Sequence, residues 1–205
     1  SYKKHFNKLS NFYTDEVYVY GEGWIQYHLD HFGYSKDLTN FKVIGYTNLA
    51  KFHFKGKVDI CYIAQSLVED SRLSYEDFNN TLKFLQELNK KFKVVVKRHP
   101  RSDDKLYNEF NLQITDDIPD ATLYIGHYSS LLAYVLHKKK KVALLPLEGH
   151  CIPDYFLSSA HNMNDLELDQ LMKEELNNDE ISANDIHTYF EWPIATEEVV
   201  KALLL

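Results

Sequence analysis

Between residues 58 and 147, short apolar runs alternate with longer segments of helical spacing, and this alternation constrains the fold more than any other feature. The runs lie at 58–67, 93–97, 121–127 and 141–147 and consist mainly of valine, isoleucine, leucine, alanine and tyrosine. Strands that are apolar along their whole length are typical of a parallel sheet with helices on both faces. The sequence therefore predicts an α/β domain with a doubly wound, Rossmann-like parallel sheet.

Helices are predicted between and after these strands. Within 74–92, apolar residues recur at helical spacing from Phe78 to Leu88, and Ser74 precedes them as an N-cap. Further helices are predicted at 104–110, 129–139, 164–176 and 196–205. Upstream, 15–21 is predicted to be a strand and 22–33 to be partly helical.

Two parts of the chain are expected. Residues 58–205 carry the strand and helix alternation and are predicted to form a nucleotide-sugar-binding domain. Residues 1–57 are too few and too irregular for a second doubly wound domain, so they are interpreted as a partial N-terminal segment. The chain of 205 residues has a formal net charge of −7, which argues against a nucleic-acid partner.

The compartment is inferred from the cysteines and from hydropathy. Cys61 and Cys151 have no metal-ligand spacing and form no disulfide framework, which favours the reducing cytoplasm. No apolar segment is long enough to span a bilayer, and the polar start is unlike a secretory signal. Any membrane contact is therefore expected to be peripheral, at the inner face. The basic run 137–141 would be its source, although it reads more simply as a solvated helix end.

Polar and basic residues follow the strand at 93–97, beginning with Lys97, Arg98, His99 and Pro100. In doubly wound sheets ligands bind outside the carboxyl ends of the strands. Pro100 holds His99 in extended backbone, and histidine can donate a proton near neutral pH. One interpretation is a solvated basic turn. The other is a wall of an anion site, in which His99 assists a phosphate leaving group while Lys97 and Arg98 add electrostatic support.

The strand at 121–127 contains Gly126 near its end and is followed by Ser129 and Ser130 at a predicted helix start. A serine there is often only an N-cap. Two hydroxyls at the positive end of a helix dipole also make a phosphate site. Because Gly126, Ser129 and Ser130 are expected beside the end of the strand that carries His99, the two motifs together predict a nucleotide-phosphate site.

Two carboxylates complete the candidate site. Glu22 stands between Gly21 and Gly23, where a tight turn would display its carboxylate as a general base toward a sugar hydroxyl; a plain surface turn explains the pattern equally well. Glu148 follows the strand at 141–147 and is placed to accept hydrogen bonds from ribose hydroxyls.

The order of a carboxylate-Gly turn, a His-Pro pair and a Ser-Ser pair resembles the bacterial sialyltransferases of the GT-B fold, which include lipooligosaccharide sialyltransferases and capsular polysialyltransferases. The resemblance covers mainly residues 58–200. It implies an inverting glycosyltransferase that transfers sialic acid from CMP-sialic acid to a cell-surface glycan, with no metal and no cofactor beyond the donor. It also implies that Glu22 is the general base, that His99 assists departure of CMP, and that Ser129 and Ser130 contact the phosphate.

The chain departs from that family in two respects. Gly21 occupies the first acidic position of the acidic-acidic-Gly motif, and residues 1–57 cannot supply a complete acceptor domain. The His-Pro and Ser-Ser pairs also resemble the CDP-glycerol glycerophosphotransferases, which likewise release a cytidine nucleotide. A non-catalytic α/β module that binds a glycan or a partner is the remaining alternative.

Overall fold

The computed structural model describes residues 15–45, 56–103 and 105–148, and further on 153, 156, 160–162, 168–173 and 189–190. The chain divides into two compact units, Lys51–Ser182 and a smaller unit that combines Ser1–Ala50 with Ala183–Leu205. This division differs from the predicted one at 57/58, because it assigns the C-terminal residues to the smaller unit. The sequence pattern does not indicate that C-terminal residues belong to the same unit as the N-terminal ones.

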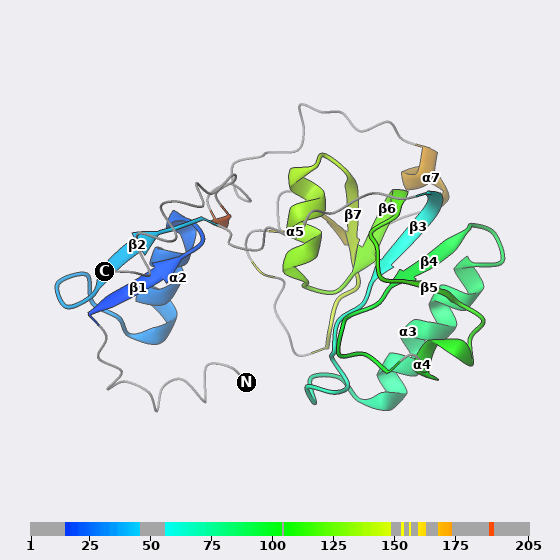
Figure 1. The fold of residues 1–205 in the computed structure, drawn as a ribbon, viewed down its shortest axis with the longest axis horizontal. Coiled ribbons are helices and arrows are strands. Elements are labelled where there is room, and N and C mark those ends of the chain that lie inside the picture. Colours follow the sequence, from blue (N-terminus) through cyan, green and yellow to red (C-terminus); the bar gives the residue numbers. More distant parts are fainter. Residues whose placement is uncertain are drawn as a thin grey trace. The chain divides into compact units, whose positions relative to one another are not determined.

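The larger unit is built on a parallel sheet of six strands (Figure 1). Its strands are β3 (Lys57–Ile63), β4 (Val94–Lys97), β5 (Gln113–Thr115), β6 (Asp120–Gly126), β7 (Lys141–Leu144) and β8 (His161–Asn162). Their order across the sheet is β5-β4-β3-β6-β7-β8, and every neighbouring pair is parallel. The predicted α/β class with a doubly wound, Rossmann-like sheet is confirmed.

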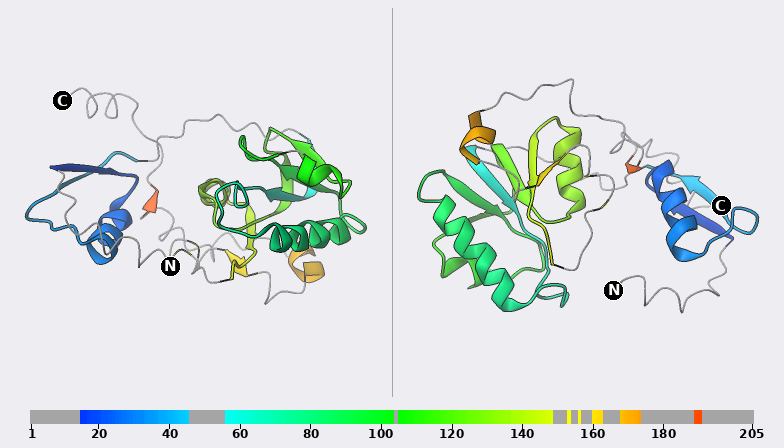
Figure 2. Two further views of the ribbon diagram at one scale, coloured as in Figure 1. Left: turned by 90° about the horizontal axis from the view of Figure 1, so that it is seen from below. Right: turned by 180° about the vertical axis from the view of Figure 1, so that it is seen from behind.

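Helices cover both faces of this sheet (Figures 1 and 2). On one face, α3 (Tyr75–Leu88), α4 (Lys105–Asn108) and α7 (Leu168–Lys173) contribute to a single apolar cluster that includes Ile60, Tyr62, Val94 and Val96. On the other face lies α5 (Ser130–His137), whose buried leucines and valine are outside that cluster. Side chains alternate between the faces along a strand, so both faces of β3 are buried, and this is why the run reads as continuously apolar.

Three strands were not predicted, namely β5, β8 and β2 (Asn40–Val43). Each is four residues or shorter and lies at the edge of its sheet or pairs with a single partner. β2 and β5 are partly exposed and β8 has only two residues, so all three lack the long apolar run that marked the central strands.

The smaller unit contains a parallel β-α-β arrangement of β1 (Glu16–Val19), α2 (Glu22–Phe32) and β2. Gly33 ends α2 in the left-handed region, with φ of 70°, as C-terminal glycines often do. Trp24 packs edge-on against Tyr189 and Phe190, with ring centroids 5.6 and 6.2 Å apart. The predicted strand at 15–21 and helix at 22–33 are therefore present within a residue or two of their bounds.

In the part of the chain that the structure describes, no helix combines the length and the apolar character that crossing a bilayer requires. The whole of the predicted helix at 196–205 lies outside the described residues, as do Cys151 and residues 48–55.

Candidate functional site at the carboxyl edge of the sheet

The order in which strands are added to the sheet changes direction between β3 and β6. After β3 the chain adds β4 and β5 on one side of it. The chain then crosses to the other side of β3, where it adds β6, β7 and β8. In open α/β sheets the loops at such a switch point diverge and leave a crevice outside the carboxyl ends of the strands. The loops that follow β3, β4, β6 and β7 therefore form the candidate site.

Hydrogen bonds tie these loops together across the edge. The backbone N–H of Tyr128, after β6, donates to Oε1 of Gln65, after β3, at 3.0 Å. The hydroxyl of Tyr128 in turn accepts from the N–H of Leu147, after β7, at 3.1 Å. Gln65 and Tyr128 were not singled out from the sequence, because their role is to join loops that only the folded chain brings together.

His99 lies in the loop after β4 and is partly buried. Its Nδ1 accepts a hydrogen bond from the backbone N–H of Arg101 at 3.2 Å, so the neutral ring carries its proton on Nε2. Burial, reinforced by the charge of Arg101, lowers the pKa of His99 below 6.5. At neutral pH the ring is thus mainly neutral and offers its Nε2–H group as a hydrogen-bond donor, and the predicted role of His99 in leaving-group departure stays a prediction.

Lys97 and Arg98 differ in what they can offer a ligand. Lys97, the last residue of β4, is partly buried, which lowers its pKa, and its Nζ donates to the carbonyl of Arg98 at 2.7 Å. Arg98 forms an ion pair with Asp116, which directly follows β5. The backbone N–H of Arg98 donates to the backbone carbonyl of Thr115. Arg98 is therefore engaged on the β5 side of β4, the side away from the switch point. Its nucleotide-binding role stays a prediction, as does that of the exposed Pro100.

Ser129 is the N-cap of α5, and its Oγ accepts from the N–H of Leu131 at 3.2 Å. The capping interpretation is therefore confirmed for this serine. Ser130 is the exposed first residue of the helix. α5 starts close behind the end of β6, whereas α3 starts only at Tyr75, well beyond the end of β3 at Ile63. The positive end of α5 thus follows its strand more closely in the sequence than that of α3 does.

The loops of His99 and Ser129 are not neighbours, contrary to the sequence expectation, because β3 lies between β4 and β6. Two strand spacings amount to about 10 Å. One phosphate group is too small to bridge that distance by itself. A nucleoside monophosphate with its attached sugar has the length to reach from one loop to the other.

Gly126 was predicted to contact the ligand, but the structure supplies a packing reason for a glycine there. A Cβ at this position would lie 3.0 Å from the carbonyl oxygen of Ile63 and 3.0 Å from Cδ1 of Leu132. The close approach of β3 and α5 leaves no room for a side chain.

We expect Gly126→Ala to destabilise the larger unit by about 1–3 kcal/mol, because the added methyl overpacks the contact between β3, β6 and α5. Urea denaturation followed by circular dichroism measures this change. Thr122→Ala, at an exposed position of the same strand, is the matched control and should change stability by about 0.5 kcal/mol or less. A Gly126→Ala protein with unchanged stability but weakened nucleotide binding would instead support the ligand-contact interpretation.

Glu148 is exposed and follows the buried Leu147 after β7, so its carboxylate lies at the same edge. Glu22 belongs to the smaller unit, where it opens α2 and does not stand in the predicted glycine turn. Gly23 faces the ring of Tyr189, since a Cβ on it would lie 3.0 Å from that ring. The helix starts at Glu22 because Gly21, in extended backbone, serves as its N-cap.

The exposed carboxylate of Glu22 contributes to an open hollow of about 540 Å³ within the smaller unit. The other lining groups include Asp15, Lys36, Asp37 and Asn40. Such a mixture of carboxylates, an amide and an ammonium group can accept and donate hydrogen bonds to a sugar. The predicted role of Glu22 as general base is compatible with this setting and stays a prediction.

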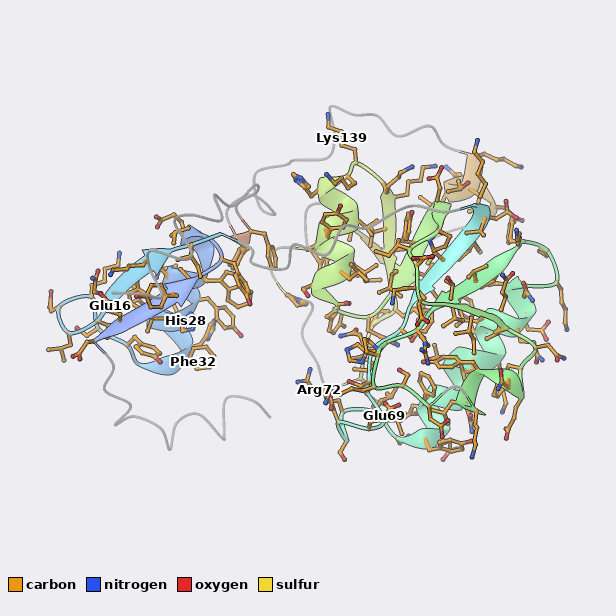
Figure 3. All side chains as sticks on the ribbon, viewed as in Figure 1. Glu16, His28, Phe32, Glu69, Arg72 and Lys139 are labelled. Atoms are coloured by element: carbon orange, nitrogen blue, oxygen red, sulfur yellow. The ribbon has the colours of Figure 1, made fainter. Side chains whose placement is uncertain are left out.

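The basic run 137–141 is largely engaged in contacts within the larger unit. Nζ of Lys138 lies 5.4 Å from the ring centroid of Tyr134, Lys140 pairs with Asp120 at 2.7 Å, and the buried Lys141 donates to the carbonyl of Leu171 at 2.7 Å. Figure 3 shows Lys139 at the opposite end of the unit from Glu69 and Arg72, which mark the carboxyl edge. These contacts leave the peripheral membrane contact a prediction without structural support.

His127 is a buried group at this edge that the sequence analysis did not select. Its Nδ1 donates to the carbonyl of Leu145 at 2.8 Å, and its side chain is buried, with 2% of the residue exposed. Nε2 has no hydrogen-bond partner in the structure as described. Burial lowers the pKa of His127 to about 4, so the ring is neutral at physiological pH and braces the loops after β6 and β7.

Among the described residues, no group of three histidine, cysteine, aspartate or glutamate side chains is arranged to hold a metal ion. Cys61 is a buried free thiol in β3, and burial raises its pKa to about 12. A thiol in that state is an apolar packing group rather than a nucleophile.

Comparison with protein-family models, with curated proteins and with solved structures found no match.

Proposed function

We propose that this chain is an inverting glycosyltransferase, or its donor-binding part, that transfers sialic acid from CMP-sialic acid to a glycan acceptor without a metal. The observation that carries the proposal is the state of His99. The residue presents a neutral Nε2–H donor at the carboxyl edge, where α5 begins with two serines. The Nε2–H group of His99 lies on one side of the β3 loop and the N-terminus of α5 lies on the other. This arrangement suits a phosphate that carries a substituent at each end.

A nucleoside monophosphate fits this edge better than a dinucleotide. The connection between β3 and α3, residues 64–74, contains no glycine, so it lacks the glycine-rich turn that lets backbone approach a pyrophosphate. Glu148, exposed after β7, is available for ribose hydroxyls.

The proposed reaction breaks the bond between the anomeric carbon of sialic acid and the phosphate oxygen of CMP, and the electron pair stays on that oxygen. The Nε2–H of His99 donates a hydrogen bond to the phosphate as its charge grows, with Lys97 nearby in sequence as a cation. The acceptor hydroxyl attacks the anomeric carbon and gives its proton to a general base, the role that the sequence resemblance implies for Glu22. The product is the glycoside with inverted configuration, together with CMP.

Isothermal titration calorimetry with CMP, CDP and UDP tests the proposal. We expect CMP to bind more tightly than UDP. Lys139→Ala removes a cation at the opposite end of the larger unit and serves as the control, which should bind CMP like the unmodified protein. Equal weak binding of CMP and UDP, or no binding of CMP, would contradict the proposal. Preference for CDP over CMP would favour glycerophosphate transfer from CDP-glycerol.

A further inference from the structure

We infer that Asp70 and Ser66 are positioning residues which, through Arg101, hold the ring of His99 in its Nε2–H tautomer. The functional meaning of this tautomer rests on the proposed function, because the Nε2–H group is the donor offered to the phosphate. The contact itself is a property of the ligand-free protein and can be measured without substrate.

The guanidinium of Arg101 is held at three points by the loop after β3. Nη1 lies 3.0 Å from Oδ1 of Asp70 and Nη2 lies 3.0 Å from Oδ2, so the ion pair is bidentate. Nη2 also donates to Oγ of Ser66 at 2.9 Å, and that hydroxyl donates to Oδ2 of Asp70 at 2.9 Å. Bidentate pairing fixes the orientation of an arginine side chain as well as its position.

The loop that supplies these groups is itself ordered. The N–H of Asp70 donates to the carbonyl of Ser66 at 2.9 Å, and the N–H of Arg72 donates to the carbonyl of Leu67 at 2.8 Å. Ser66 is buried, and Ser71 has a φ of 55°, a conformation that residues other than glycine adopt mainly when surrounding contacts impose it. The anchor for Arg101 is therefore a built turn rather than a solvated chain segment.

A second contact joins the same two loops. The N–H of Asp103 donates to Oε1 of Glu69 at 3.2 Å, beside the pair between Arg101 and Asp70. Glu69 and Arg72, labelled in Figure 3, mark this part of the loop after β3. Together the two contacts fix the path of residues 101–103 relative to β3.

This fixed path determines where the backbone N–H of Arg101 points. Pro100 restricts the backbone on one side of that N–H, and the anchored guanidinium restricts it on the other. The N–H donates to Nδ1 of His99, and an Nδ1 that accepts cannot carry the proton of the neutral ring. If the ring carried its proton on Nδ1, Nε2 would present a lone pair, which a phosphate oxygen repels.

The tautomer of His99 can be read from the nitrogen chemical shifts of ¹⁵N-histidine-labelled protein above the pKa of the ring. We expect the unmodified protein to show Nε2–H. In Asp70→Asn the bidentate ion pair is lost and the N–H of Arg101 is released, so the population of the Nδ1–H tautomer should rise about fivefold, the factor expected for one ordinary hydrogen bond.

Glu69→Gln is the matched control. Arg101 and Lys97 lower the pKa of His99, whereas Asp70 and Glu69 raise it, so both substitutions remove a negative charge that acts on the ring in the same direction. Only Asp70→Asn releases Arg101, because glutamine at position 69 still accepts from the N–H of Asp103. The tautomer ratio in Glu69→Gln should therefore match that of the unmodified protein.

Arg101→Ala keeps the backbone N–H but removes the exposed guanidinium, so it should reproduce the tautomer mixture of Asp70→Asn with little effect on folding. An unchanged ratio in both Asp70→Asn and Arg101→Ala would overturn the inference, as would an equal change in Glu69→Gln. Titration of the same proteins with CMP separates the two proposals. If CMP fails to bind the unmodified protein, the proposed function fails while the tautomer measurement still decides the positioning role.

Discussion

His99→Ala is expected to lower the rate of CMP release from CMP-sialic acid by about 10²–10³-fold, the range found when a single donor to a developing negative charge is removed. The reason is that His99 is a neutral hydrogen-bond donor, with Nδ1 occupied by the N–H of Arg101 and Nε2–H directed by that contact. His99→Gln places an amide N–H close to the position of Nε2. We therefore expect it to retain much of the rate, with a loss of about tenfold, which is the effect of roughly 1.4 kcal/mol.

Chromatographic measurement of CMP released from CMP-sialic acid, with and without acceptor, gives these rates. Lys139→Ala is the control, since Lys139 lies at the opposite end of the larger unit and should leave the rate unchanged (Figure 3). Equal loss in His99→Ala and His99→Gln would mean that the residue transfers a proton instead of donating a hydrogen bond. A rate that is the same in His99→Ala and the unmodified protein would contradict the proposed role altogether.

Acidification is expected to destabilise the larger unit through His127. The pKa of this group is about 4 in the folded protein against 6.5 for an unperturbed histidine, because its burial disfavours the charged ring. Between these two values the unfolded chain binds one more proton than the folded one, so stability falls as the pH is lowered. Stability is unaffected by this group above pH 6.5 and is reduced by up to about 3 kcal/mol once the pH reaches the folded pKa.

Urea denaturation at a series of pH values, followed by circular dichroism, measures this loss. His127→Asn is the comparison, because its side-chain N–H can still donate to the carbonyl of Leu145 while the side chain does not titrate. Carboxylates whose pKa is lowered by partners, such as Asp70 and Asp116, also lose stabilisation in acid. They are common to both proteins, so the difference between the two curves isolates His127. Parallel curves between pH 4 and 6.5 would contradict the prediction.

The local sequence pattern was sufficient to predict the central elements of the larger unit. β3, β4, β6 and β7 are buried on both faces, and only continuous apolar runs satisfy that requirement. The capping of α3 by Ser74, whose Oγ accepts from the N–H of Asp77 at 3.0 Å, is likewise a short-range interaction. Both signals are contained within a few consecutive residues, so they are visible before the chain is folded.

Part of the candidate site could also be predicted from local sequence patterns. The rule that ligands bind at carboxyl strand ends pointed to His99, Ser129 and Glu148 and needs only the strand assignments. It could not reveal that β3 separates the loops of His99 and Ser129, because strand order depends on the packing of the whole sheet. The hydrogen bonds that place Arg101, Gln65 and Tyr128 at the edge depend on the same order.

The fold class, the central strands of the sheet and the His-Pro and Ser-Ser motifs can be recognised in the amino-acid sequence alone, since burial on two faces and helix capping depend on short stretches of chain. The contacts of each charged residue become apparent only in the folded chain. Arg98 pairs with Asp116 after the neighbouring strand, and Arg101 pairs with Asp70 after β3. Salt bridges and hydrogen bonds form only between groups a few ångströms apart, and the order of the strands sets which groups come that close.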